Sequence, residues 1–162
     1  MIKRSAVARR PFMHDIRPLI PLLITAGILI GGNGLQGTFI ALRGIEEGFS
    51  TSVIGMVGAG YFIGFVFGCV YITKIMRAIG HIRAFSALAA IASAASIMMV
   101  LVIDPISWFL MRLVQGVCFA GLFAVVESWL NARVTNATRA RTLSVYRFVD
   151  LGSVTSAQYI IP

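Results

Sequence analysis

Apolar residues form five long runs along the chain, and each run is bounded by charged residues, a proline or a glycine. A helix rises about 1.5 Å per residue, so roughly 20 apolar residues can cross the hydrocarbon core of a bilayer. The first four runs are long enough, and we expect the fifth to begin a crossing that the chain end interrupts. The pattern predicts membrane helices over residues 17–42, 51–76, 82–103 and 106–130, and the start of another over 143–162.

The fourth run carries the clearest functional signal. Between residues 105 and 131 it holds Trp108 and Trp129, which a helix would place about 31 Å apart, close to the thickness of a hydrocarbon core with an interfacial aromatic at each boundary. Arg112 and Glu127 lie between these tryptophans. Charges inside a membrane span are costly unless they face a cavity or a partner, so they are typical of transport pathways.

The composition excludes an ordinary soluble domain. The chain has 58% apolar residues, 12% charged residues and a mean hydropathy of +0.89, whereas soluble domains have about a quarter of their residues charged. These values predict an all-α, polytopic membrane helix bundle. Cys69 and Cys118 have no His or second Cys nearby at metal-ligand spacing, so we expect no metal and no cofactor.

The net charge of +8 is better explained by membrane topology than by nucleic-acid binding, because the bases lie in short runs between apolar spans without interleaved aromatic residues. Basic residues favour the cytoplasmic side, which makes the N-terminus and the connections after the second and fourth spans cytoplasmic. The other two connections hold Arg43 beside Glu46, Glu47 and Asp104, and are predicted to face outward. The cytoplasmic bases are Lys3, Arg4, Arg9, Arg10 and Arg17, then Lys74, Arg77 and Arg83, then Arg133, Arg139 and Arg141.

Small residues repeat every four positions along two of the spans. Close backbone approach drives helix association in lipid, so such ladders are expected to be buried against neighbouring helices. The first ladder is Gly60, Gly64 and Gly68, and the second is Ser86, Ala90 and Ala94.

The first span contains a glycine-rich stretch that brings Asn33 and Gln36 into the apolar layer. Counting residues inward from the outer ends of their spans places Gln36 and Arg112 at a similar depth, about 9 Å. These polar groups are predicted either to line one cavity in the outer half of the membrane or only to bond to neighbouring helices.

Glu127 needs a partner other than Arg112, because fifteen residues of helix separate the two by about 22 Å. Arg147 should reach the level of Glu127 from the fifth span, and Asp150 follows one turn later. A carboxylate whose proton affinity depends on burial and on a nearby Arg suits a proton-coupled carrier. The alternative is a static ion pair that fixes the fourth helix to the fifth.

Arg112, Gln115 and Gly116 form an R-x-x-Q-G sequence that resembles the signature in the fourth helix of major facilitator superfamily transporters. The resemblance implies that Arg112 is the buried arginine of that motif, which is often tied to proton coupling. The chain departs from the family pattern at Cys118 and Phe119, where small residues are usual.

The stretch 74–83 resembles the loop between helices two and three of the same superfamily. It keeps the glycine, Gly80, and the bases Lys74 and Arg83, but Arg77 stands where the family has an aspartate, so the usual gating contact through that aspartate is not implied. Residues 127–131 and 139–146 resemble an uncharacterised bacterial branch with this same degenerate loop. Lys74, Arg77, Gly80 and Arg83 are the expected cytoplasmic gating residues.

The resemblance implies the N-terminal portion of a fold with twelve helices in two six-helix halves. Residues 1–16 would be a basic cytoplasmic segment and residues 17–162 an incomplete N-terminal half, with a C-terminal half missing. The implied function is secondary active transport of a small molecule by alternating access across a bacterial inner membrane, coupled to protons. The implied substrate and proton pathway comprises Arg112, Gln115, Asn33, Gln36, Glu127, Arg147 and Asp150.

Three alternatives remain open from the sequence. The first is a complete four-helix multidrug-type transporter that works as a dimer. Members of that class resemble one another in an acidic residue in the first helix, and the first span of this chain has none. A membrane enzyme is not expected, because His14 and His81 lie in the cytoplasmic flanks and no Ser-His-Asp set can be placed at one depth. A non-catalytic membrane scaffold would leave the intramembrane charges with little purpose.

Overall fold

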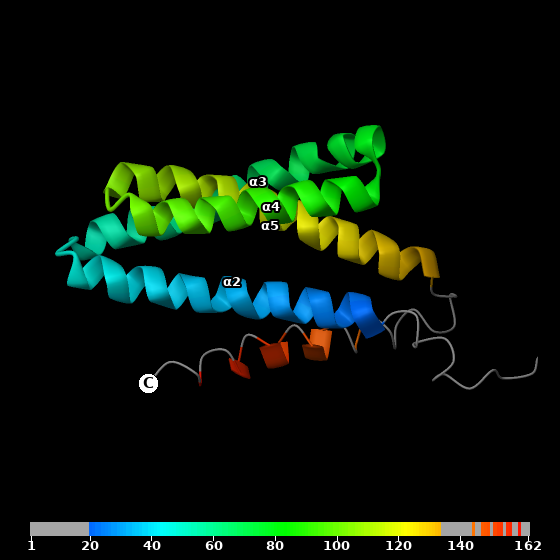
Figure 1. The fold of residues 1–162 in the computed structure, drawn as a ribbon, viewed down its shortest axis with the longest axis horizontal. Helices are drawn as coiled ribbons and strands as arrows, with labels where there is room; N and C mark the ends of the chain where they lie inside the picture. Colours follow the sequence, from blue (N-terminus) through cyan, green and yellow to red (C-terminus); the bar gives the residue numbers. More distant parts are fainter. Residues whose placement is uncertain are drawn as a thin grey trace, which may run out of the picture.

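Four long helices make up the main part of the computed structural model, which describes residues 20–133 and, beyond them, residues 144, 147–149, 151–153, 155–156 and 159. The four helices are α2 (Ile20–Glu46), α3 (Thr51–Ile79), α4 (His81–Leu101) and α5 (Pro105–Arg133) (Figure 1). Each is long and apolar enough to cross a membrane. The described residues form no strand, and the predicted all-α membrane-type bundle is confirmed.

Helix α3 ends later and helix α4 begins earlier than the apolar runs predicted, and this corrects the predicted loop at residues 74–83. Lys74 and Arg77 lie within the last turns of α3, Gly80 is the single residue between α3 and α4, and Arg83 lies in the first turn of α4. The apolar pattern ended the span at residue 76 because charges mark a membrane boundary. Helical hydrogen bonding continues beyond that boundary until Gly80, whose φ of 84° ends it.

The glycine ladder of α3 packs directly against α5, as predicted. A Cβ added at Gly60 would lie 2.9 Å from the Phe109 carbonyl oxygen, and one added at Gly64 would overlap the Leu113 carbonyl. Gly116 of α5 has the reciprocal position, where a Cβ would overlap the Tyr61 carbonyl of α3. Both helices therefore use glycine to bring their backbones together, which is a strong source of packing energy between membrane helices.

The second ladder was wrongly predicted. Ser86, Ala90 and Ala94 are exposed, and α4 instead buries a stripe that lies two residues out of phase with them, roughly on the opposite side of the helix. This stripe packs toward α5, where Leu88 fills the space beside Gly121. Its residues are Ala84, Leu88, Ala92, Ala95 and Met99.

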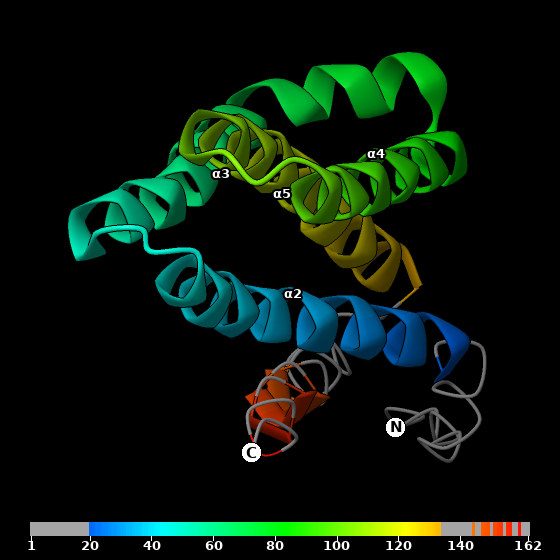
Figure 2. The ribbon, with the colours of Figure 1, turned by 60° about the vertical axis from the view of Figure 1, so that its left-hand side comes forward.

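Helix α2 runs along one side of the bundle formed by α3, α4 and α5 (Figures 1 and 2). The described residues of the predicted fifth span, drawn in orange and red in Figure 2, lie beside α2 and are helical except at residue 159. Gly27 gives them room, because a Cβ there would lie 3.1 Å from both the Val149 and Ser153 side chains.

Candidate functional site

Arg112 lies in the second turn of α5 and points into the bundle, where 7% of the residue is exposed. Gln115 follows one helical turn later on the same face and is fully buried. The Nη1 atom of Arg112 donates a hydrogen bond to Oε1 of Gln115 at 3.2 Å. The R-x-x-Q spacing noted in the sequence therefore produces a hydrogen-bonded pair inside the apolar core.

Tyr61 of α3 supports Arg112 from the other side. The guanidinium carbon lies 4.6 Å from the centre of the Tyr61 ring, within the range of a cation–π contact. The Tyr61 hydroxyl accepts a hydrogen bond from Nδ2 of Asn33 on α2 at 3.0 Å. Sequence reasoning did not select Tyr61, although its position next to Gly60 on the packing face of α3 was a usable signal.

Ser96 of α4 connects the remaining amides. Its Oγ accepts hydrogen bonds from Nε2 of Gln115 at 2.9 Å and from Nε2 of Gln36 at 3.1 Å. The same hydroxyl donates to the Ala92 carbonyl at 3.0 Å. A hydroxyl has one donor and two acceptor positions, so Ser96 is fully used. Sequence reasoning missed it, because the three serines of this apolar helix give no sign of which one faces the bundle.

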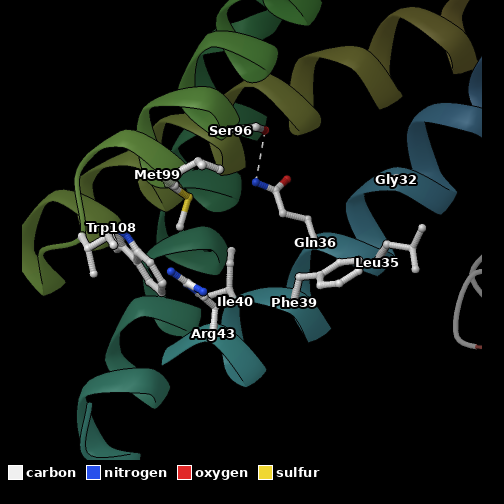
Figure 3. Close-up of a pocket in the computed structure, with 11 residues that line it drawn as sticks. Gly32, Leu35, Gln36, Phe39, Ile40, Arg43, Ser96, Met99 and Trp108 are labelled. Carbon is white, nitrogen blue, oxygen red and sulfur yellow. Dashed lines mark hydrogen bonds between the residues drawn. The ribbon is translucent and has the colours of Figure 1, made fainter. Parts of the chain in front are cut away.

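The Arg112 network comprises these six residues from all four helices: Asn33, Gln36, Tyr61, Ser96, Arg112 and Gln115. Three of them, Asn33, Gln36 and Arg112, are the polar residues that the sequence placed together in the outer half of the membrane. Both α2 amides bond to neighbouring helices, and Gln36 also lines a pocket of about 680 Å³ between α2 and α4. Figure 3 shows Gln36 and Ser96 joined at one end of this pocket and Arg43 beside Trp108 at the other.

The charge of Arg112 is not balanced by a carboxylate in the described part of the chain, where the ion pairs join Arg43 to Glu46 and to Glu47. Its Nε atom is buried without a hydrogen-bond partner, and so is Oδ1 of Asn33. A buried cation whose hydrogen bonds are incomplete is costly in a low-dielectric interior. Such a group is typical of a functional site rather than of a packing element.

Curated proteins similar to this chain are membrane transporters by name. An uncharacterised MFS-type transporter of Enterobacter sp. (strain 638) is 29% identical over 133 residues, and the uncharacterised MFS-type transporter YcaD of Escherichia coli O139:H28 is 31% identical over the same length. The chain is homologous to MFS-type transporters. The alignments cover 82% of the chain and 35% of each relative, so the chain spans about a third of their length. No protein-family model matches the chain, and no solved structure does.

Glu127, the α5 member of the second predicted charge cluster, lies away from the Arg112 network. Glu127 is exposed near the end of α5, fifteen residues from Arg112 on one continuous helix. Arg147 is also exposed, while Asp150 lies outside the described residues. The Glu127–Arg147 pair and the role of Asp150 stay predictions.

The stretch 74–83, which resembles the superfamily's loop, lies at the end of the bundle where α3 meets α4. Lys74 and Arg83 are exposed, and the backbone of Arg77 is helical. At this end His81 Nε2 and Ser128 Oγ lie 3.0 Å apart in a hydrogen bond, which links the start of α4 to the end of α5. The gating role of these residues stays a prediction.

Proposed function

We propose that this chain is part of a secondary active transporter that moves a small molecule by alternating access and couples transport to protons. The relatives named as MFS-type transporters support transport as the activity, rather than catalysis. The chain covers only about a third of those relatives, and we propose that the working protein contains a further half that completes the substrate cavity.

The buried Arg112 network is the observation that carries this proposal. Arg112 is held by Tyr61 and Gln115 but not by a carboxylate of the described residues, so an anionic group that approached it would gain a desolvated charge partner. The hydrogen bonds of the network join α2, α4 and α5, and the Tyr61 contact adds α3. A movement of the Arg112 side chain would therefore alter contacts that involve all four helices. Binding of an anionic group at Arg112 could in this way change how the helices pack against one another.

The charge distribution supports an orientation with the N-terminus in the cytoplasm of a bacterium and the α3–α4 connection on the same side. The Arg112 network then lies in the outer half of the inner membrane. Protons entering from outside would meet it first, while Glu127 and Asp150 would serve the inner half of the path.

The test is uptake into proteoliposomes by the complete transporter that contains this sequence, with and without an imposed pH gradient. Candidate substrates are selected first by their ability to raise the melting temperature of the purified protein. Arg112→Lys keeps the charge but loses the planar fork of donors, so gradient-driven uptake should fall at least tenfold while folding is retained. Arg43→Lys, an exposed change of the same chemistry outside the proposed pathway and gating residues, is the control. Uptake that ignores the pH gradient in the wild-type protein would remove proton coupling from the proposal.

A further inference from the structure

The guanidinium of Arg112 has a donor that its neighbours leave unused. Its Nη1 atom donates to Gln115 and its central carbon lies over the Tyr61 ring, whereas Nε is buried without a hydrogen-bond partner. Nε and Nη2 together form the edge with which a guanidinium binds a carboxylate side-on through two parallel hydrogen bonds, and Nη1 is not part of that edge. The bond to Gln115 therefore leaves the Nε edge to another acceptor.

This unused donor lies inside the described bundle rather than on its surface. Arg112 is 7% exposed, and the network around it contains residues from all four helices. A further helix that covered an outer face of the bundle would not reach Nε without displacing these residues. An acceptor for Nε therefore has to be small enough to enter between the helices when they separate, as in the alternating access proposed above.

Tyr61 fixes the direction in which the Nε edge points. Its backbone lies close against α5, because Gly116 has no side chain and a Cβ there would overlap the Tyr61 carbonyl. The centre of its ring lies 6.3 Å from that of Phe119, and its hydroxyl accepts a hydrogen bond from Asn33. A ring held at its backbone, its side and its hydroxyl gives the guanidinium a fixed support, so little freedom is lost at Arg112 when a ligand binds.

The surroundings of Arg112 favour a planar anion with two oxygens. Arg112 and Gln115 are the polar members of the buried set in the described part of the chain, and the other members are apolar or aromatic. A carboxylate lies in the plane of the guanidinium and directs both oxygens at its edge. A sulfonate or phosphate projects a third oxygen out of that plane, and in an apolar interior this oxygen would lose its water without gaining a donor.

We infer that the Nε edge of Arg112 binds the carboxylate of a small organic anion, with Gln115 bonded to Nη1 and Tyr61 as the residue that positions the guanidinium. The inference rests on the proposed transport function and names the chemical class of its substrate. Neither the bond to Gln115 nor the contact with Tyr61 has to break when the carboxylate arrives. The site is therefore preorganised for this ligand.

Three fluorinated probes test the ligand class by fluorine NMR in nanodiscs that contain the complete transporter. Trifluoroacetate and trifluoromethanesulfonate carry the same trifluoromethyl group and the same charge, but they differ in having a planar or a tetrahedral anionic group. Trifluoroacetamide keeps the shape of trifluoroacetate without the charge. We expect saturable line broadening with a dissociation constant about tenfold lower for trifluoroacetate than for trifluoromethanesulfonate, and no saturable broadening for trifluoroacetamide. Equal dissociation constants for the two anions, or no saturable broadening of trifluoroacetate, would overturn the inference.

A pair of conservative variants assigns the site to Arg112. Arg112→Lys keeps the charge but loses the edge with two donors, so the two anions should bind with similar dissociation constants. Arg43→Lys makes the same change at an exposed residue outside the network and should retain the preference for trifluoroacetate. A preference that persists in Arg112→Lys would show that the carboxylate binds elsewhere and would refute the site.

The positioning role of Tyr61 is tested with Tyr61→Phe and Tyr61→Leu. Phe keeps the ring beside the guanidinium, so the dissociation constant for trifluoroacetate should stay close to that of the wild-type protein. Leu removes the ring and should raise this dissociation constant about threefold. The ratio between the two anions is compared as well, since a general loss of stability would weaken both and leave their ratio unchanged. The same preference for trifluoroacetate in both variants would contradict a positioning role for the ring.

Uptake driven by a pH gradient separates this inference from the proposed function. Gradient-driven uptake of a substrate without a carboxylate, by a transporter that does not bind trifluoroacetate, would overturn the inference and leave the transport proposal intact. Saturable binding of trifluoroacetate whose preference is lost in Arg112→Lys would support the site even if a pH gradient drives no uptake. In that case proton coupling would be abandoned and the carboxylate site retained.

Discussion

The guanidinium of Arg112 rests on the ring of Tyr61, with the guanidinium carbon 4.6 Å from the ring centre. The cation therefore has an aromatic face on α3 as its support, and the hydroxyl of the same tyrosine reaches Asn33 on α2. One residue thus links the charged site to two helices by two different interactions, and these interactions can be removed one at a time.

Replacing Tyr61 by Phe or by Leu should separate the two contributions. Phe keeps the ring but loses the bond to Asn33, which should lower the free energy of unfolding by about 1 kcal/mol. Leu also loses the cation–π contact, which should cost about 1 kcal/mol more. Unfolding by denaturant in detergent measures both. A Tyr61→Leu protein as stable as Tyr61→Phe would contradict a stabilising contact between the ring and Arg112.

Removing the Ser96 hydroxyl should affect α2 and α5 together. Ser96→Ala deprives Gln36 and Gln115 of their common acceptor, and the expected loss of stability is about 1–2 kcal/mol. Ser93→Ala, an exposed serine one turn earlier on α4, is the control and should change stability by less than about 0.5 kcal/mol. Equal melting temperatures for the two variants would show that the hydrogen bonds to Ser96 contribute nothing.

The contact between α3 and α5 should not tolerate a methyl group at Gly64. A Cβ there overlaps the Leu113 backbone, so Gly64→Ala must push the helices apart and should cost about 3 kcal/mol. Gly58→Ala on the same helix meets no atom within 4 Å and should be neutral or stabilising by up to about 1 kcal/mol. Protease resistance and melting temperature report the difference. A folded, heat-stable Gly64→Ala protein would refute the packing of α3 on α5.

The predicted orientation can be tested at two exposed positions at opposite ends of the bundle. In a background with Cys69→Ser and Cys118→Ser, Glu46→Cys should react with an impermeant thiol reagent added to intact cells, and Ala78→Cys should react only after permeabilisation. Both positions are exposed in the structure, so a failure to react reports the side of the membrane rather than burial. Labelling of Ala78→Cys from outside would reverse the orientation.

The predicted ion pair between Glu127 and Arg147 can be tested by exchanging the two charged residues. If the pair is structural, Glu127→Ala and Arg147→Ala should each lower stability in the complete transporter, and the swapped protein with Glu127→Arg and Arg147→Glu should regain part of it. If Glu127 instead carries a proton, Glu127→Gln should leave expression normal and abolish uptake driven by a pH gradient. A variant with normal gradient-driven uptake would exclude the second role.

The number of helices, the glycine face of α3 and the grouping of Arg112 with Asn33 and Gln36 could be predicted because they depend on span length, spacing and depth. The rotation of each helix about its own axis could not be predicted from the sequence. Helix α4 is apolar around its whole circumference, so its pattern contains no preferred face. The ladder at Ser86 was misplaced for that reason, and the role of Ser96 was missed for the same reason.

Gly80 constrains how the bundle can move. Its φ of 84° and ψ of 157° belong to a backbone region that is essentially limited to glycine, and it alone connects α3 to α4. A connection of one residue cannot lengthen, so α3 cannot slide along α4 at this end of the bundle. In the proposed transport cycle, the ends of α3 and α4 that meet at Gly80 would therefore move together, whereas α2 joins α3 across a longer connection at residues 47–50.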